Sequence, residues 1–306
     1  MPYHTFTIPK KSGGTRTITA PDKELKAKQR DLLEILYKTS SPSNLCHGFV
    51  KGRSPMTNAQ KHVGKKYIAG MDVKDFFPSC RYYGFPNSDK YSFRTIREYE
   101  EVLYHNGSLP QGAPTSPHIA NLYLSDFDCQ AVSVLREHVS DDIVYTRYAD
   151  DITVSSNSRA IEKAPEIIAR MIRSHGMELN ESKTRIDGSG SRQNITGYNV
   201  NAGRVTVPKS YRKKVRAMVH RATVSGWILT EKQLESLNGM ISHIATAHPG
   251  EASRYREQLK GVKTVKGNPK RAIKKRVQLR SKTKFKATEI KEHGESSPTI
   301  TRRIII

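Results

Sequence analysis

The stretch Tyr148-Ala149-Asp150-Asp151, which sets two acids side by side between strand-like segments, constrains the fold most. Residues 143–145 lead into it and residues 152–154 leave it, and both are rich in β-branched side chains, which predicts a β-hairpin. A third acid, Asp72, ends the strand-like run over residues 67–71. Three carboxylates at one sheet edge would repel one another and favour a hard cation, Mg²⁺ or Mn²⁺. Taken alone, an Asp-Asp pair is ordinarily typical of a solvated turn.

The charge balance indicates a polyanionic partner. The 306 residues include 52 Lys and Arg against 29 Asp and Glu, a net charge of +23. From residue 251 onward there are 17 Lys and Arg against 5 Asp and Glu. An excess of this size favours salt-sensitive binding to nucleic acid. The length allows one large domain or two to three smaller ones with a sizeable core.

The cysteines and the N-terminus predict a cytoplasmic protein without a membrane partner. Cys46, Cys80 and Cys129 are odd in number and far apart, so neither a disulfide framework nor a zinc site is indicated. The N-terminus lacks the basic and apolar stretches of a secretion signal. No segment approaches the ~18 apolar residues of a membrane span.

Local patterns predict the elements before the acidic hairpin. Residues 4–10 and 15–20 alternate in polarity on either side of a glycine turn, which predicts a second hairpin. Asp22 is a typical helix cap, and the residues after it have an apolar face at helical spacing. That face consists of Leu25, Leu32, Leu33 and Leu36.

Further helices alternate with these strands. Ser116 followed by Pro117 predicts the N-cap of one long helix that reaches Leu135. Residues 159–174 predict another helix, ended by Gly176, and a strand near residues 183–186 follows. The sum is an α+β layer with helices on one sheet face. Two more helices are predicted, one after Pro208 and one over residues 234–244.

Residues 109–117, Leu-Pro-Gln-Gly-Ala-Pro-Thr-Ser-Pro, read as a rigid loop that feeds a helix N-terminus. Gly112 would allow the backbone to approach a flat ligand. By itself the segment is equally a proline-rich loop before a capped helix. The motif indicates a function only when it is considered together with the motifs before and after it in the chain.

Residues 72–77 (Asp-Val-Lys-Asp-Phe-Phe), 111–117 and 148–151, in this order, resemble the palm motifs of reverse transcriptases. The resemblance continues through residues 179–184 and 195–197 and spans roughly residues 10–208. Residues 58–62 and 195–197 fall where bacterial retron reverse transcriptases carry characteristic stretches, with Ile195 where valine is typical.

The resemblance implies a right-hand polymerase fold of the α+β class. It implies fingers in residues 1–70, with residues 81–110 contributing, and a ferredoxin- or RRM-like palm in residues 71–204. A helical thumb would occupy residues 205–262, followed by a basic C-terminal segment over residues 263–306.

It also implies two-metal nucleotidyl transfer with two Mg²⁺ ions, for which Mn²⁺ can substitute. Asp72 and Asp150 would bridge the ions, Asp151 would complete the acidic cluster, and the main-chain carbonyl of Val73 would be a further ligand. Lys183 would protonate the leaving pyrophosphate. Without cations, the carboxylates should raise one another's pKa.

The family pattern further implies substrate contacts. Phe77 would exclude a 2′-hydroxyl from the deoxynucleoside triphosphate site, although its plain alternative is a core aromatic. The basic residues could instead be solvated, and Asn58 and His62 could be a helix cap and a surface histidine. The implied nucleotide-binding residues are Lys10, Lys11, Arg16, Phe77, Gln111 and Gly112. The implied primer- or RNA-binding residues are Asn58, His62, Thr196, Gly197, Arg212, Lys213 and Arg216.

The expected function is that of a retron RNA-directed DNA polymerase. By resemblance, it would copy its cognate structured noncoding RNA into branched multicopy single-stranded DNA, primed from a guanosine 2′-hydroxyl, in anti-phage defence with a separately encoded effector protein. One alternative is another bacterial type, either diversity-generating or abortive-infection. Another is a noncatalytic RNA-binding scaffold, against which the intact acids, Gln111 and Lys183 speak.

Overall fold

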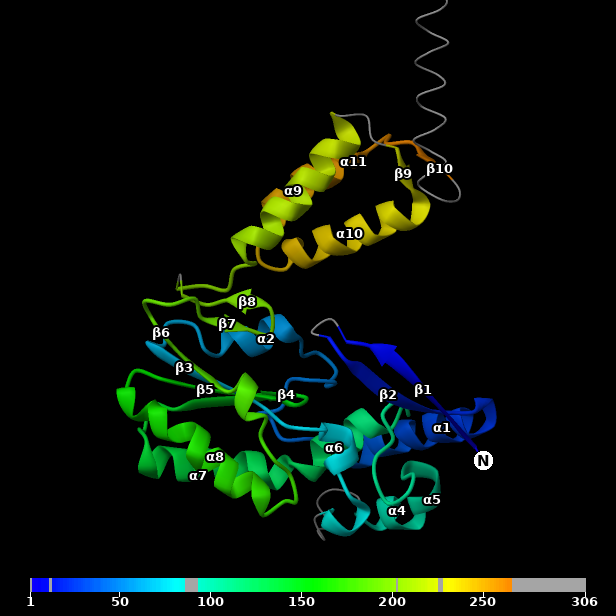
Figure 1. Ribbon diagram of the computed structural model, residues 1–306, viewed down its shortest axis with the longest axis vertical. Helices are drawn as coiled ribbons and strands as arrows, with labels where there is room; N and C mark the ends of the chain where they lie inside the picture. The colour runs from blue at the N-terminus through cyan, green and yellow to red at the C-terminus, as the bar shows by residue number, and fades with distance from the viewer. Residues whose placement is uncertain (1, 11–12, 86–92, 202, 225–227, 266–306) are drawn as a thin grey trace, which may run out of the picture. The chain divides into compact units, whose positions relative to one another are not determined.

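The computed structural model describes residues 2–10, 13–85, 93–201, 203–224 and 228–265 (Figure 1). The chain divides into two compact units, Met1–Pro208 and Lys209–Ile306. The boundary predicted between palm and thumb, after residue 204, lies shortly before this division.

The first unit begins with the predicted hairpin. Strands β1 (Tyr3–Pro9) and β2 (Thr15–Pro21) pair antiparallel along their whole length. Helix α1 (Lys23–Thr39) follows, and the Asp22 carboxylate accepts a hydrogen bond from Leu25 N at 2.8 Å, as expected of a cap. Hairpin and capped helix are therefore confirmed, except that Leu33 is only half-buried.

Four antiparallel strands form the central sheet of this unit, with helices α7 (Ser125–His138) and α8 (Ala164–Arg173) along one face (Figure 1). Along the chain the order is strand, helix, two strands, helix, strand. This order and the strand arrangement are those of the ferredoxin-like fold, so the predicted class and palm topology are confirmed. Across the sheet, the strands are β4 (Val144–Tyr148), β5 (Asp151–Ser156), β3 (Tyr67–Asp72) and β6 (Arg185–Gly188).

Three predicted boundaries are wrong. The long helix is broken into α6 (Ser116–Tyr123) and α7 at Leu124, whose ψ of 10° leaves the helical range and whose side chain is fully buried. Ser116 is not the N-cap, because it lies inside α6 and its hydroxyl donates to Pro110 O at 2.8 Å. The helix over residues 159–174 starts as the 3-10 turn η3 (Arg159–Lys163) before α8.

The strand expected near residues 183–186 starts later than predicted. Residues Glu181–Lys183 form the 3-10 turn η4, and β6 begins only at Arg185. Lys183 therefore lies on a turn that leads into the sheet, so the alternation of side chains along a strand does not fix the direction of its side chain.

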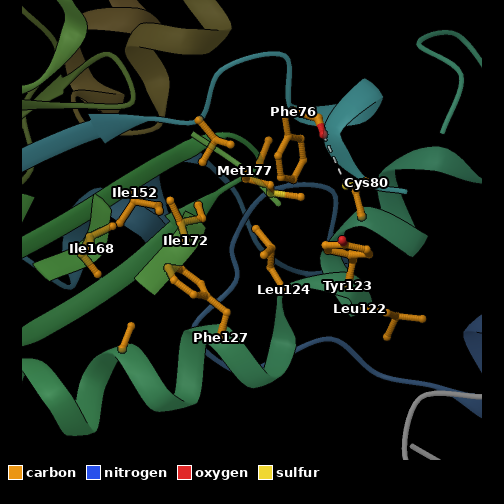
Figure 2. Packing of buried hydrophobic residues seen from close by; sticks show 14 of the residues in the cluster. Phe76, Cys80, Leu122, Tyr123, Leu124, Phe127, Ile152, Ile168, Ile172 and Met177 are labelled. Atoms are coloured by element: carbon orange, nitrogen blue, oxygen red, sulfur yellow. Dashed lines mark hydrogen bonds between the residues drawn. The ribbon is translucent and has the colours of Figure 1, made fainter. Parts of the chain in front are cut away.

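The core of the first unit lies between the sheet and the helices on its covered face. Figure 2 shows Phe127 of α7 and Ile172 of α8 beneath the strand that carries Ile152. Phe76, in the short helix α3 (Phe76–Ser79), extends this cluster to the end of β3, where the Cys80 thiol donates to Phe76 O at 3.3 Å. Each buried aromatic or aliphatic side chain contributes roughly 1.5–3 kcal/mol. The ends of β3 and of the acidic hairpin are therefore supported by this cluster of packed side chains.

The opposite face of the sheet is covered by α2 (Pro55–Gln60) and the small hairpin of β7 (Asn194–Ile195) and β8 (Tyr198–Asn199) (Figure 1). His62, just after α2, reaches two hydroxyl groups of the sheet. The remaining short helices of the unit are η1 (Tyr82–Gly84), α4 (Phe93–Glu98) and α5 (Glu100–Leu103).

The second unit is a helical bundle around buried side chains such as Val219 and Ile241. Thr230 caps α10 through a reciprocal capping box with Gln233. The two predicted helices are confirmed. In neither unit does a described helix combine the length and apolar character needed to cross a membrane. Its elements are α9 (Lys209–Thr223), β9 (Leu229–Thr230), α10 (Glu231–Ala245), α11 (Pro249–Leu259) and β10 (Thr264–Val265).

Candidate active site

Sheet register brings Asp72 and Asp151 together. Strands β3 and β5 pair antiparallel so that these two residues are direct cross-strand partners at the end of the sheet. Such partners have their Cβ atoms about 4.5–5.5 Å apart and point to the same face. Two acids in this arrangement are destabilising unless a positive charge joins them.

Asp150 is held next to this pair by the hairpin turn. Ala149 adopts a left-handed conformation with φ of 57°, and the buried Arg147 guanidinium donates to Ala149 O at 3.2 Å. Val73 N, just beyond Asp72, donates to Asp150 O at 2.9 Å. The turn and the end of β3 are therefore joined by a backbone hydrogen bond, which places Val73 beside Asp150.

Burial, with a smaller contribution from the neighbouring acids, raises the pKa values of Asp150 and Asp151. Desolvation by the surrounding protein raises the pKa of Asp151 to about 6, with further contributions from Asp150 and Asp72. Desolvation also raises the pKa of Asp150, with Asp72 adding to the effect. The cluster of carboxylates is therefore left with negative charge that a nearby cation would neutralise.

Lys183 supplies part of that charge. Its ammonium group lies 2.8 Å from Asp72 Oδ1, and this hydrogen bond raises the pKa of Lys183. Asn180 N donates to Asp72 O at 2.7 Å and so fixes the segment that carries the lysine. The structure therefore brings Lys183 to the acids and favours its cationic form, and its role as a proton donor stays a prediction.

The donor chemistry fits a divalent cation, because carboxylates are hard oxygen ligands and two of them have raised pKa values. However, no three acidic, histidine or cysteine side chains in the described residues form a set that could hold a metal ion by itself. The expected convergence of Asp72, Asp150 and Asp151 on shared ions is thus only partly met. The ion pair between Asp72 and Lys183 accounts for one carboxylate oxygen in this arrangement.

Two depressions open beside the acids, and Asp72 and Lys183 line both. The first, of about 520 Å³, lies between the β1–β2 hairpin and the sheet end. Its volume is in the range of small-molecule sites, roughly 300–1,000 Å³. It collects most of the predicted nucleotide-binding residues. Its lining includes Lys10, Arg16, Phe49, Asp72, Val73, Phe77, Gln111, Asp150 and Lys183.

An aromatic pair forms one wall of the first depression. Phe77 is half-buried, with its ring centroid 5.3 Å from that of Phe76 and 6.3 Å from that of Phe49. It is therefore at the depression surface and not a closed core residue. Sequence reasoning missed Phe49, whose only local signal is its position after Gly48 in a loop without regular periodicity.

The loop over residues 109–117 contributes Gln111 but not Gly112. Gln111 lines the first depression while its carbonyl accepts a hydrogen bond from Thr19 N at 2.9 Å. Gly112, with φ of 143°, faces strand β2, and a Cβ there would lie 2.9 Å from Thr19 O. The glycine thus permits close packing on the hairpin, not on a flat ligand, which corrects the prediction. Lys11 lies outside the described residues.

The second depression, of about 400 Å³, lies on the other side of Asp72. Thr196 and Gly197 line it from the β7–β8 turn, where both have positive φ, as in a type I′ hairpin turn. Arg185 of β6 also lines it, and its charge offsets part of the rise in the pKa of the nearby Asp151. Sequence reasoning missed Arg185, whose signal is Gly70 on the neighbouring strand, where a Cβ would lie 3.0 Å from the guanidinium carbon.

Asn58 and His62 do not fit direct contact with RNA. Both are buried, because α2 packs on the sheet with this face inward. His62 bridges Ser155 Oγ and Thr146 Oγ1, each at 2.7 Å, and burial lowers the pKa of His62 to about 3. The two residues are parts of the interior, neither surface groups nor RNA contacts.

In the second unit, Arg212 differs from its neighbours. Its Nε donates to Glu251 Oε2 of α11 at 2.7 Å, so its guanidinium joins two helices of the unit. Its assignment as a primer contact stays a prediction. Lys213 and Arg216 are exposed on α9 and keep the predicted availability for nucleic acid.

Comparisons with known proteins agree with this arrangement. The sequence model of the family "Reverse transcriptase (RNA-dependent DNA polymerase)" matches residues 8–200. The chain is 35% identical over 280 residues to the retron Mx65 reverse transcriptase of Myxococcus xanthus, with 84% of this chain and 64% of that protein covered. It is 31% identical over 294 residues to the Mx162 enzyme of the same species, with 84% and 60% covered.

A retron relative in another species is covered more fully. The retron Ec86 reverse transcriptase of Escherichia coli is 32% identical over 248 residues, with 79% of this chain and 75% of that protein covered. The chain spans less than two thirds of the length of the two Myxococcus relatives.

Proposed function

Because the chain belongs to the reverse transcriptase family and, within it, to the retron reverse transcriptases, we propose that it is an RNA-directed DNA polymerase. The observation that carries the proposal is the pair of depressions that share Asp72 and Lys183. One has basic and aromatic walls suited to a nucleoside triphosphate. The other has a tight turn and Arg185 suited to the end of a primer. A transfer between the two ligands would occur at the shared acids.

The first depression supplies the contacts for the incoming nucleotide. Lys10 and Arg16 would neutralise the triphosphate, for which the arginine fork is suited. Phe77 would lie against the sugar and exclude a 2′-hydroxyl, and Gln111 would line the base side. Lys183, kept cationic by Asp72, would donate a proton to the leaving pyrophosphate.

The acids would hold the metal ions. Asp72, Asp150 and Asp151, with the carbonyl of Val73, would bind two Mg²⁺ ions, or Mn²⁺ in their place. When bound, the ions would lower the pKa of the primer hydroxyl and neutralise charge in the in-line displacement. Thr196 and Gly197 would steady the primer end, and Lys213 and Arg216 would contact phosphates.

Primer extension tests the activity. The parent chain should add deoxynucleotides to a DNA primer on an RNA template, and Asp150→Asn should abolish the addition. Asp141→Asn is the matched control, because Asp141 is an exposed acid away from both depressions. Undiminished synthesis by Asp150→Asn would contradict the proposal and favour the noncatalytic scaffold.

We further propose that the template is a cognate structured noncoding RNA and the product branched multicopy single-stranded DNA. The retron relatives and the matched motifs support this. Sequencing the nucleic acid that copurifies with the chain should give one RNA joined through a 2′-hydroxyl to DNA. Unbranched, heterogeneous RNA would favour a diversity-generating or abortive-infection type instead.

The proposed setting is anti-phage defence in the cytoplasm, together with a separately encoded effector protein. In cells carrying the chain and its neighbouring genes, phage plating should fall, and Asp150→Asn should restore it. If phage plate equally on cells with the parent chain and on cells with the variant, the polymerase activity is not required for defence.

A further inference from the structure

A third depression, of about 690 Å³, adjoins the site and has no role in the function proposed above. It lies between the C-terminal end of α1 and the loop that follows it, with His118 of α6 contributing from below. Two aromatic side chains line it, Tyr37 and Phe49, and they are 51% and 49% exposed. Large aromatic surfaces exposed in a depression are typical of ligand sites.

Phe49 lines both the first and the third depressions, so it is a wall between them. Its backbone has φ of 58°, a conformation that costs a bulky residue energy and persists only when the surroundings impose it. Those surroundings are fixed: His47 N donates to Arg147 O at 2.7 Å, and Asn121 Nδ2 donates to Gly48 O at 2.8 Å. The ring is therefore held at the border by the same elements that hold the acidic turn.

Tyr37 is held on the far side of the third depression. Its ring meets that of His118 edge-on, with centroids 4.8 Å apart, and the buried His118 in turn lies 3.1 Å from Ser40 Oγ. The ring thus has a fixed orientation and a large exposed surface. Lys51 brings a positive charge to the lining and Glu34 a negative one, so a phosphate would be favoured only on the lysine side.

We propose that the third depression binds the unpaired template nucleotide that is next in line to be copied, with its base stacked on Tyr37 and Phe49. The inference rests on the proposed template-directed synthesis. A template is continuous, so the nucleotide beyond the one being copied must leave the first depression through an adjoining space. Aromatic rings stack on any base, which suits a template of varying sequence, and Lys51 would contact its phosphate.

Template length provides the test. The dissociation constant is measured for a dideoxy-terminated DNA primer on an RNA template, with the next deoxynucleoside triphosphate and Mg²⁺ present. The template either ends at the copied base or carries one unpaired nucleotide beyond it. For the parent chain, the extra nucleotide should tighten binding at least about fivefold, as expected for one base stacked on aromatic side chains. An abasic extra nucleotide should lose this gain.

Variants locate the effect. Tyr37→Leu should abolish the gain, and Tyr37→Phe should retain it. Tyr83→Leu is the matched control, because Tyr83 is 92% exposed and lines none of the three depressions. Absence of a gain in the parent chain, or a gain that survives either Tyr37→Leu or the abasic template, overturns the inference.

An unblocked primer keeps the two proposals apart. Incorporation of the next deoxynucleotide on both templates, without any gain from the extra nucleotide, removes only the third-depression site. If the next deoxynucleotide is incorporated on neither template, the proposed polymerase activity and this inference are both wrong.

Discussion

Removal of the Asp128 carboxylate, in the variant Asp128→Ala, should destabilise the first unit by about 3–5 kcal/mol. Asp128 and Arg147 form an ion pair in which both side chains are fully buried. Arg147 donates to the two carboxylate oxygens from Nε and Nη2, each at 2.8 Å, and Tyr145 OH donates to Oδ1 at 2.8 Å. Burial lowers the pKa of Arg147, but Asp128 outweighs it, and the pKa is raised overall. The variant therefore leaves a buried charge without its partner.

A second variant separates charge from position. In Asp128→Leu with Arg147→Met, both charges are replaced by apolar side chains, and most of the lost stability should return. The variant still lacks the donation from Arg147 to Ala149 O, which supports the turn that carries Asp150. Primer extension should then remain reduced, on the order of 10²-fold for a displaced reacting group.

Urea denaturation of the full chain, followed by far-UV circular dichroism, measures the stability. Tryptophan emission does not serve, because the single tryptophan, Trp227, belongs to the other unit. A loss below about 1 kcal/mol in Asp128→Ala would refute the reasoning. So would a double variant that is no more stable than the single one.

Four further predictions concern single groups. Without divalent ions, the contribution of Asp151 to stability should fall as pH rises from about 4 to 6, because its pKa is about 6 in the fold against 3.8 unperturbed, and Asp151→Asn should gain stability relative to the parent chain over this range. The contribution of His62 runs the opposite way and should fall as pH drops below 6.5 toward 3, because His62 stays neutral in the fold; His62→Gln should reduce the acid loss, of which His47 and His118 carry a further share, and an unchanged acid limb would contradict the burial of His62. Phe77→Ala should admit ribonucleotides, and an unchanged ratio of deoxyribo- to ribonucleotide incorporation would remove its assignment. Lys213→Ala should reduce the slope of log affinity against log salt by about 1, whereas Arg212→Ala should chiefly lower the melting temperature of the second unit.

Short-range patterns predicted much of the fold. The alternation around residues 148–151 specified the acidic hairpin, and the Asp22 cap specified the start of α1. Both depend on residues within a few positions of one another. The motif order then predicted which residues would gather, and Lys10, Arg16, Phe77 and Gln111 do line one depression with the acids.

The features that the sequence did not predict depend on packing between residues that are far apart in the chain. The break at Leu124 carries neither proline nor glycine, and the side chain there is fully buried, so no local pattern marks the break. His62 reads as a surface residue until α2 is packed on the sheet, where Ser155 and Thr146 meet it. Gly112 reads as a ligand contact until strand β2 is placed against it. In each case the partner is distant in the chain.

Asp72 borders both depressions, and this would give the two substrates proposed for them a thermodynamic link. A ligand that offsets the Asp72 charge from one side changes the electrostatic potential felt on the other. By reciprocity, whatever factor the primer end imposes on nucleotide affinity, the nucleotide imposes on the primer end. Cooperativity between the two would therefore be a property of one shared carboxylate and would not require a change in conformation.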